Sequence, residues 1–171
     1  DTATASEGAT PVSPLASNIQ AGSKRRYASG LLQKGKRSYT DRAYAFTRVP
    51  ESLDGAEIIR TSNEDDGSRG QTFLTFDLGL ASTVLVAHDV RVKQRPEWLQ
   101  GFTDAGLTVA TSDTQFRLWS KDFLPGQVTL GGNIAAHGGP KANYFVVIQP
   151  KPLTPPAAPT TEEPSLAAGG E

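Results

Sequence analysis

The stretch HDVRVKQRPEWLQGF, residues 88–102, carries the side chains best suited to chemistry in this sequence. His88 and Asp89 together could form a catalytic or metal-binding pair. They end the almost continuously apolar run 82–89, which is typical of a buried central strand. Adjacent strand residues point to opposite faces, so we expect the two side chains to diverge. We therefore predict structural roles: a strand-end hydrogen bond for His88, and a turn with an ion pair to Arg91 for Asp89.

Other catalytic and cofactor motifs are missing. The second histidine, His137, lies in a Gly-rich loop, and two histidines without a cysteine make a weak set of transition-metal ligands. The lack of cysteine excludes disulfides, thiolate metal sites, cysteine nucleophiles and c-type haem. No G-x-S-x-G, P-loop, Rossmann or H-E-x-x-H pattern occurs, and no carboxylate pair stands out for glycoside hydrolysis. We expect a protein that is not an enzyme and carries no cofactor.

The acidic stretch SNEDDGSRG, residues 62–70, offers a weak candidate for a calcium site. Asn63, Asp65 and Asp66 could supply the oxygen ligands that Ca²⁺ prefers. Their spacing differs from an EF-hand loop, which places ligands at positions 1, 3 and 5 and a Glu at position 12. The pattern favours a solvated hairpin loop.

Trp119 is the most interesting aromatic residue for binding. In the strand-like segment TQFRLWSKDF, Phe116 and Leu118 share the face expected to be buried, and Trp119 alternates to the other face with Arg117 and Lys121. An exposed tryptophan between two cations could contact a sugar ring or a partner side chain. Alternatively, another segment of the chain covers it.

Charge is nearly balanced overall but unevenly distributed. The sequence has 17 basic and 18 acidic residues, which gives no indication of binding to nucleic acid or membranes. Residues 24–48 contain eight basic residues against one acid, whereas residues 51–66 contain six acids against one base. Such asymmetry can steer association with a partner, or both segments can be solvated loops. Arg25 and Arg26 are therefore candidate binding residues, together with Trp98, which we mainly expect to seal one end of the fold.

Short strands separated by turn residues fill the middle of the chain. We expect them at residues 44–49, 57–61, 71–79, 82–89, 107–111, 114–123, 126–130 and 142–149. Gly, Pro, Asp and Asn lie at most of the joins. About eight strands at roughly ten-residue spacing predict an all-β fold, an antiparallel β-sandwich or jelly roll. The one helical indication is a turn at PEWLQ, with Pro96 at its first position.

The two ends of the chain have a different composition from the middle. Residues 1–23 are small and polar, and the C-terminal stretch is rich in Pro, Ala and Thr. Neither has the periodicity of a core element. We predict three parts: an extended N-terminal arm with the basic segment (1–38), a β-sandwich domain (39–149) and a Pro/Ala-rich C-terminal arm (150–171). Extended arms can order on a partner and cover a wide surface.

Several short motifs occur together in the middle region. They are D-R-x-Y at Asp41, V-P-x-x-L at Val49, V-A-H-D at Val86, P-x-W-L at Pro96, F-T-x-x-G at Phe102 and L-G-G-N at Leu130. In this order they resemble an accessory β-sandwich module of secreted bacterial polysaccharide-active enzymes such as pectate lyases. The resemblance covers about residues 39–149. It implies a non-catalytic, carbohydrate-binding-like module, and such a resemblance carries over a fold better than a ligand.

Two functions of different classes remain open. The first is a non-catalytic accessory or structural subunit that docks through its arms on other protein subunits of an exported assembly. The second is a carbohydrate-binding module that recognises a polysaccharide through Trp119 and its basic neighbours. No stretch reaches the about 18 apolar residues of a membrane helix. The chain opens at Asp1 without a signal-like segment, as a processed protein would, so we expect a periplasmic or extracellular location.

Overall fold

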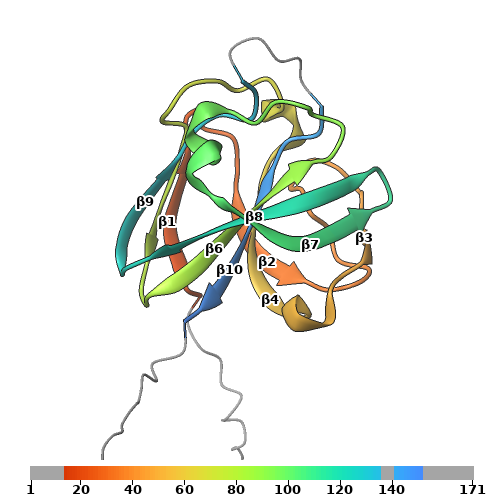
Figure 1. The fold of residues 1–171 in the computed structure, drawn as a ribbon, viewed down its shortest axis with the longest axis horizontal. Coiled ribbons are helices and arrows are strands. Elements are labelled where there is room, and N and C mark those ends of the chain that lie inside the picture. The colour runs from red at the N-terminus through yellow and green to blue at the C-terminus, as the bar shows by residue number, and fades with distance from the viewer. Residues whose placement is uncertain (1–13, 136–140, 152–171) are drawn as a thin grey trace, which may run out of the picture.

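The computed structural model describes residues 14–135 and 141–151, and these form an antiparallel β-sandwich with short 3-10 helices (Figure 1). The strands are β1 (Ala16–Ala21), β2 (Ala28–Leu32), β3 (Phe46–Arg48), β4 (Ala56–Arg60), β5 (Leu74–Leu78), β6 (Ser82–Asp89), β7 (Thr103–Thr111), β8 (Gln115–Phe123), β9 (Gly126–Leu130) and β10 (Phe145–Pro150). The 3-10 helices are η2 (Glu51–Leu53), η3 (Asn63–Asp65) and η4 (Glu97–Gly101). The predicted all-β class is confirmed, and η4 lies where a helical turn after Pro96 is predicted.

The strands form one small and one large sheet. The small sheet has the order β1-β5-β9, and the large sheet has the order β2-β4-β10-β6-β8-β7-β3. All strand pairs are antiparallel, so every strand in the described residues is hydrogen-bonded to a neighbour that runs the other way. The large sheet curls around its middle strands, which brings β3 and β7 to one side of the molecule (Figure 1).

The middle of the large sheet is buried on both faces. On β6, Val84 and Val86 belong to a core shared with the small sheet, which we call the first core. Leu85 and Ala87 point the other way, into a second core enclosed by the curl of the large sheet. A strand covered on both faces needs apolar residues at successive positions rather than alternating ones. This explains the continuous apolar run in β6 and confirms the prediction made from it.

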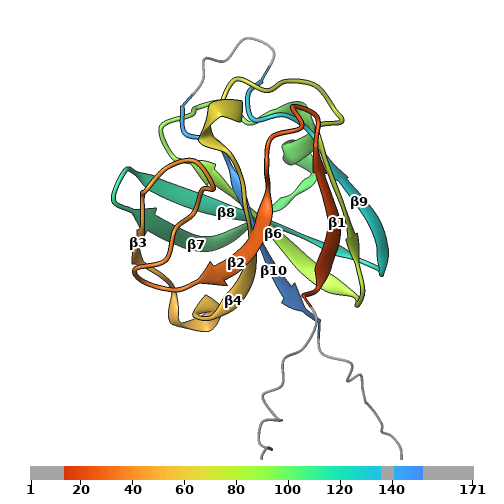
Figure 2. The same ribbon diagram turned by 180° about the vertical axis from the view of Figure 1, so that it is seen from behind.

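Strand formation begins earlier in the chain than the sequence pattern indicates. Residues 1–38 are predicted to be an extended arm, but this range contains two strands, β1 and β2. β1 pairs with β5, and β2 pairs with β4 (Figure 2). β1 is difficult to recognise because its sequence, ASNIQA, buries only its two terminal alanines, and a register shift interrupts its pairing. The carboxylate of Glu57 also accepts hydrogen bonds from the backbone N–H groups of Leu15 and Ala16, at 2.6 and 3.0 Å. The strand is therefore held by its pairing with β5, by the Glu57 carboxylate and by a small apolar contact with the first core.

Candidate functional site

A cleft of about 370 Å³ lies where the end of β6, the following loop and β8 meet. Its lining residues are His88, Asp89, Val90, Val92, Lys93, Arg95, Arg117 and Trp119. β6 and β8 pair so that His88 lies opposite Arg117 and Val86 lies opposite Trp119. Directly opposed residues of neighbouring strands project from the same face of a sheet. His88, Arg117 and Trp119 therefore lie on the face of the first core, and the loop adds two further cations to them.

Of the two alternatives open for Trp119, an exposed platform and cover by another segment, the geometry favours cover. Its side chain is partly buried and packs against the first core, while Phe116 and Leu118 belong to the second. The Cζ atom of Arg95 lies 3.8 Å from the centroid of the indole ring, so a guanidinium also covers the ring. The alternation along β8 correctly predicts that Trp119 lies on the opposite face from Phe116 and Leu118. Both faces of the strand, however, are covered by other parts of the protein.

Replacing Trp119 by alanine is expected to lower the free energy of unfolding by about 2 kcal/mol, because the indole fills space against the first core. Urea denaturation measures this change. Leu124→Ala is the control, since Leu124 is 81 % exposed and its loss should change stability by less than about 0.5 kcal/mol. A Trp119→Ala effect as small as that of the control would mean that the tryptophan is a free surface platform after all.

The charges around the cleft are mainly positive. Arg117 donates through Nη1 to both carboxylate oxygens of Asp104, at 3.1 Å each, and both side chains are close to half exposed. Arg95 donates through Nη1 to the carbonyl oxygen of Leu99 at 3.1 Å. Lys93 is exposed and forms no ion pair among the described residues. Asp89 also lines the cleft but is paired with Arg91, and Asp104 offsets only Arg117. With Lys93, Arg95 and Arg117 against these acids, the mouth of the cleft carries a net positive charge.

His88 forms the predicted strand-end hydrogen bond. Its ring is buried, and Nε2 lies 3.2 Å from the carbonyl oxygen of Asn133. A carbonyl oxygen only accepts, so Nε2 must carry the proton and Nδ1 remains an acceptor in the neutral ring. Burial lowers the pKa of His88, with opposition from the hydrogen bond to Asn133 and the charge of Asp89. The imidazole is therefore neutral at pH 7.

Asp89 points away from His88 and forms the predicted ion pair. Its carboxylate accepts hydrogen bonds from Nη2 of Arg91 at 2.6 Å and from the backbone N–H of Ala142 at 2.9 Å. Burial by itself would raise the pKa of Asp89, but the hydrogen bonds from Arg91 and Ala142 and the charge of Arg91 lower it overall. The pair closes a corner of the sandwich, and the two side chains His88 and Asp89 do not converge on one proton or metal.

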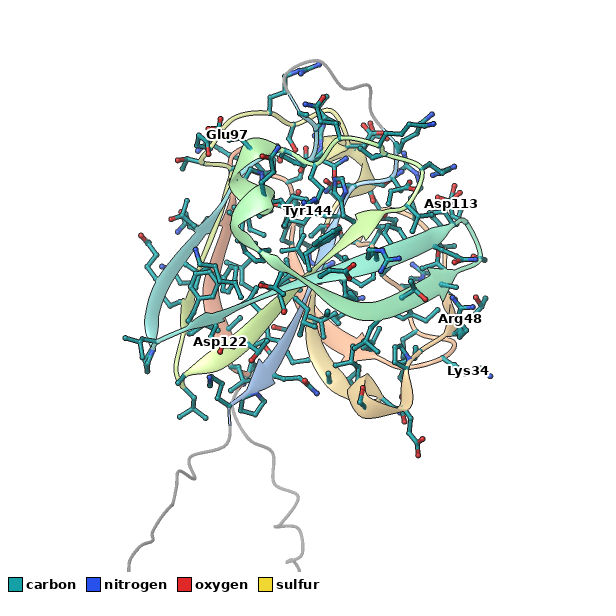
Figure 3. The ribbon with its side chains drawn as sticks, viewed as in Figure 1. Lys34, Arg48, Glu97, Asp113, Asp122 and Tyr144 are labelled. Carbon is teal, nitrogen blue, oxygen red and sulfur yellow. The ribbon has the colours of Figure 1, made fainter. Side chains whose placement is uncertain are left out.

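Trp98 and Lys121 lie outside the lining of the cleft. The indole N–H of Trp98 donates to the carbonyl oxygen of Gly132 at 2.8 Å, and its ring contacts Tyr144 edge-on at 5.5 Å between centroids. These contacts with Gly132 and with the buried Tyr144, which is labelled in Figure 3, let Trp98 seal this end of the sandwich, as expected. The Nζ atom of Lys121 lies 5.7 Å from the ring centroid of Phe102, which directs this cation toward the rim of the first core.

The remaining candidates lie elsewhere. Arg25 approaches Asp65, with Nε 3.6 Å from Oδ1, and Arg26 is exposed; neither lines the cleft. His137 falls outside the described residues. The cleft also contains two residues that are not predicted from the sequence as binding residues, Lys93 and Arg95. The run of basic residues in the segment 88–102 is the sequence signal that could have identified them.

The calcium candidate gains no support from the geometry. Oδ2 of Asp65 accepts hydrogen bonds from the hydroxyls of Ser23 and Tyr27, at 2.8 and 2.7 Å. Oδ1 of Asn63 accepts from the backbone N–H of Asn143 at 2.9 Å. In the described part of the chain, no group of three or more His, Cys, Asp or Glu residues is arranged to hold a metal ion. These polar atoms instead connect η3 to the segment between β1 and β2 and to the residues just before β10.

In residues 14–135 and 141–151, no helix is long and apolar enough to cross a membrane. No protein-family model matches the sequence.

The sandwich is similar to parts of carbohydrate-active enzymes. A β-glucuronidase of Formosa agariphila is 37 % identical over 101 residues, which is 58 % of this chain and 10 % of that protein. A solved β-glucuronidase of glycoside hydrolase family 2 superposes with a TM-score of 0.73 at 25 % identity, covering 82 % of this chain and 15 % of that one. A GH138 enzyme that targets pectin rhamnogalacturonan II shares the fold, with a TM-score of 0.50 and 14 % identity over 76 % of this chain and 16 % of that one.

The matches cover more than half of this chain but only a small part of each of the enzymes. The chain spans about a tenth of the length of the first relative and 15 to 16 % of the two solved enzymes. They agree with the broad expectation of a sandwich that accompanies carbohydrate-active enzymes. The narrower resemblance to modules of pectate lyases stays a prediction.

Proposed function

We propose that this chain is a non-catalytic β-sandwich domain of an exported carbohydrate-active protein, which packs against the other domains or subunits of that protein. The observation that carries the proposal is the similarity of most of the sandwich to a small part of a family 2 β-glucuronidase. The cleft supports a non-catalytic role, because glycoside hydrolysis uses a pair of carboxylates and the one carboxylate in its lining, Asp89, is buried and paired with Arg91. Asp89 and His88 also have structural partners.

One end of the sandwich is suited to packing against another protein. A groove of about 790 Å³ is lined by Pro14, Leu15, Ser29, Gly30, Leu31, Gly55, Glu57, Gly79, Leu80 and Pro150. Leu31 and Leu80 are 46 and 56 % exposed there, and most of the groove surface is apolar. The first and last described residues of the sandwich lie at this end (Figure 1). Exposed apolar surface of this kind marks an interaction site.

A second, basic hollow adjoins the groove. It is lined by Gly30, Leu31, Gly35, Lys36, Arg37 and Arg60, so the two hollows share Gly30 and Leu31. A partner that fits both would place apolar side chains on Leu31 and Leu80 and acidic groups near Lys36 and Arg37. The segments 1–13 and 152–171, outside the described residues, are proposed to add to the attachment, as extended arms can.

Replacing Leu80 by aspartate is expected to release the chain from its assembly, because the charge would have to be buried in the apolar groove. Light scattering of the protein purified under mild conditions from its source, with mass spectrometry of the components, measures the mass. Unsubstituted protein should give a defined complex with carbohydrate-active components, and Leu80→Asp a single chain. Leu124→Asp is the control, since Leu124 is also an exposed leucine, at 81 %, but lies outside the groove. A single chain in the unsubstituted case would contradict docking.

A second candidate function is carbohydrate recognition by the sandwich itself. The observation that favours it is the cleft at His88 and Trp119, which combines cations, a neutral hydrogen-bond acceptor and an aromatic wall. Such a mixture of apolar and polar groups is common in ligand sites. Titration of the chain with oligosaccharides tests it: saturable binding of at least one saccharide supports the candidate, and its absence across neutral and charged sugars contradicts it.

A further inference from the structure

We infer that the cleft between β6 and β8 binds a saccharide that carries an oxyanion, a uronate carboxylate or a sulfate ester, with Arg117, Arg95 and Lys93 contacting the anion. This inference rests on the second candidate function and names its class of ligand. The cleft volume of about 370 Å³ lies within the range of about 300–1,000 Å³ typical of small-ligand sites. The net positive charge of its lining favours an anionic ligand over a neutral one.

Arg95 is held in place by the tryptophan, which gives Trp119 a role other than stacking a sugar. The guanidinium lies over the indole at 3.8 Å, and its Nη1 donates to the carbonyl oxygen of Leu99 at 3.1 Å. A guanidinium has five N–H donors, so this arrangement leaves donors for a ligand. Since side-chain ordering is part of the cost of binding, an arginine already fixed by these contacts binds an anion with less loss of entropy. Trp119 is therefore a positioning residue for Arg95.

Arg117 provides a second guanidinium, whose charge is partly offset by the carboxylate of Asp104. It contacts Asp104 through Nη1 alone, and both residues are accessible to solvent. The remaining N–H groups of Arg117 can contact an oxyanion without breaking that pair, as planar guanidinium groups do with carboxylates. Asp104 repels the same ligand. Removing the charge of Asp104 should therefore strengthen anion binding, whereas removing the charge of Arg117 should weaken it.

His88 supplies a hydrogen-bond acceptor in an otherwise donor-rich cleft. The ring lines the cleft and Nε2 is engaged with Asn133, while the side-chain hydrogen bonds found within residues 14–135 and 141–151 include none to Nδ1. An acceptor of this kind suits a sugar hydroxyl, which can donate a hydrogen bond, and does not suit a bare inorganic anion. The combination of cations with one neutral acceptor thus points to a charged sugar rather than to a free phosphate or sulfate ion.

The test is isothermal titration of the 171-residue chain with matched oligosaccharides. The probes are glucuronate- and galacturonate-containing tetrasaccharides, their carboxyl-reduced neutral counterparts, a sulfated neutral tetrasaccharide and inorganic polyphosphate. The variants are Arg117→Gln, Arg95→Gln and Asp104→Asn, each checked for an unchanged melting temperature. Arg26→Gln is the matched control, because it removes the same charge at an exposed site outside the cleft. Comparing the uronate with the sulfated probe identifies the source of the oxyanion.

The expected result is binding of an anionic saccharide at least about tenfold tighter than its neutral counterpart, as the loss of one charge-assisted hydrogen bond implies. Arg117→Gln and Arg95→Gln should each lose about tenfold, Asp104→Asn should gain several-fold, and Arg26→Gln should not differ. If the two substitutions acted only by disturbing the structure, Arg117→Gln and Asp104→Asn would both weaken saccharide binding. A loss of affinity in both variants would therefore overturn the inference. Equal binding of charged and neutral sugars would overturn it while leaving carbohydrate recognition intact, and equal binding of polyphosphate would show a generic anion site. No binding of any saccharide would remove the second candidate function as well.

Discussion

Replacing Gly132 by alanine is expected to lower the free energy of unfolding by about 3 kcal/mol or more, which is a large share of the stability of a small domain. Gly132 lies in the L-G-G-N motif that follows β9. A Cβ atom at this position would collide with backbone atoms of Ser68 and Arg69. Overpacking against a side chain can be relieved by a rotamer change, but backbone atoms have no such freedom.

The neighbouring hydrogen bonds make this collision difficult to relieve. The backbone N–H of Gly132 donates to the carbonyl oxygen of Gly70 at 2.9 Å, and that of Ile134 donates to Ser68 at 3.1 Å. Moving the 68–70 segment away would therefore break these bonds and leave buried polar groups without partners. Trp98, which donates to Gly132, would lose its position at the end of the sandwich as well.

Chemical denaturation in urea measures the effect of Gly132→Ala, with Gly67→Ala as the matched control. Gly67 has open space around its Cα, so the same substitution there should change stability by less than about 1 kcal/mol in either direction. If the two variants are equally stable, the close approach of residues 68–70 and 131–133 is not a requirement of the fold.

The central strands of both sheets could be predicted from the sequence because their signals are local. The continuous apolar run of β6 and the alternation of Leu74, Phe76 and Leu78 in β5 identify strands without knowledge of their partners. β1 and β2 were missed for the opposite reason. β1 is mostly exposed and its backbone is fixed by Glu57, which lies more than forty residues away in the sequence. Such long-range hydrogen bonds leave no periodic pattern to read.

The candidate site could be predicted only in part, because alternation shows which residues share a face but not what covers that face. Arg117 and Trp119 were correctly placed together on one side of β8. The pattern could not show that the loop after β6 brings Arg95 onto the indole, since this contact depends on tertiary packing. His88 was correctly expected to form a structural hydrogen bond, yet its ring also lines the cleft. A residue can therefore have both roles, and spacing alone does not separate them.

Replacing Asp89 by asparagine is expected to lower the free energy of unfolding by about 2–3 kcal/mol at pH 7. The Asp89 carboxylate is fully buried and accepts hydrogen bonds from Arg91 and from the backbone N–H of Ala142. An asparagine of the same shape would turn an NH₂ group toward one of these donors, so a buried hydrogen bond would be lost along with the charge. Arg91 is half exposed and regains water, which keeps the loss below that of a fully buried ion pair.

The pH dependence identifies the ionised carboxylate as the source of this stability. The pKa of Asp89 is lowered in the folded protein, so its stabilisation is complete above the unfolded-state pKa of about 3.9 and is lost as pH falls toward the folded-state value. Asparagine does not titrate, so the difference between the two proteins should be constant from pH 5 to 8 and shrink below about pH 4. Asp122→Asn is the control: Asp122, labelled in Figure 3, is exposed near the end of β8 and pairs with the exposed Lys151, so the substitution should change stability by less than about 1 kcal/mol. A difference between Asp89→Asn and the unsubstituted protein that persists unchanged at pH 3 would show that shape, rather than charge, holds this corner of the sandwich together.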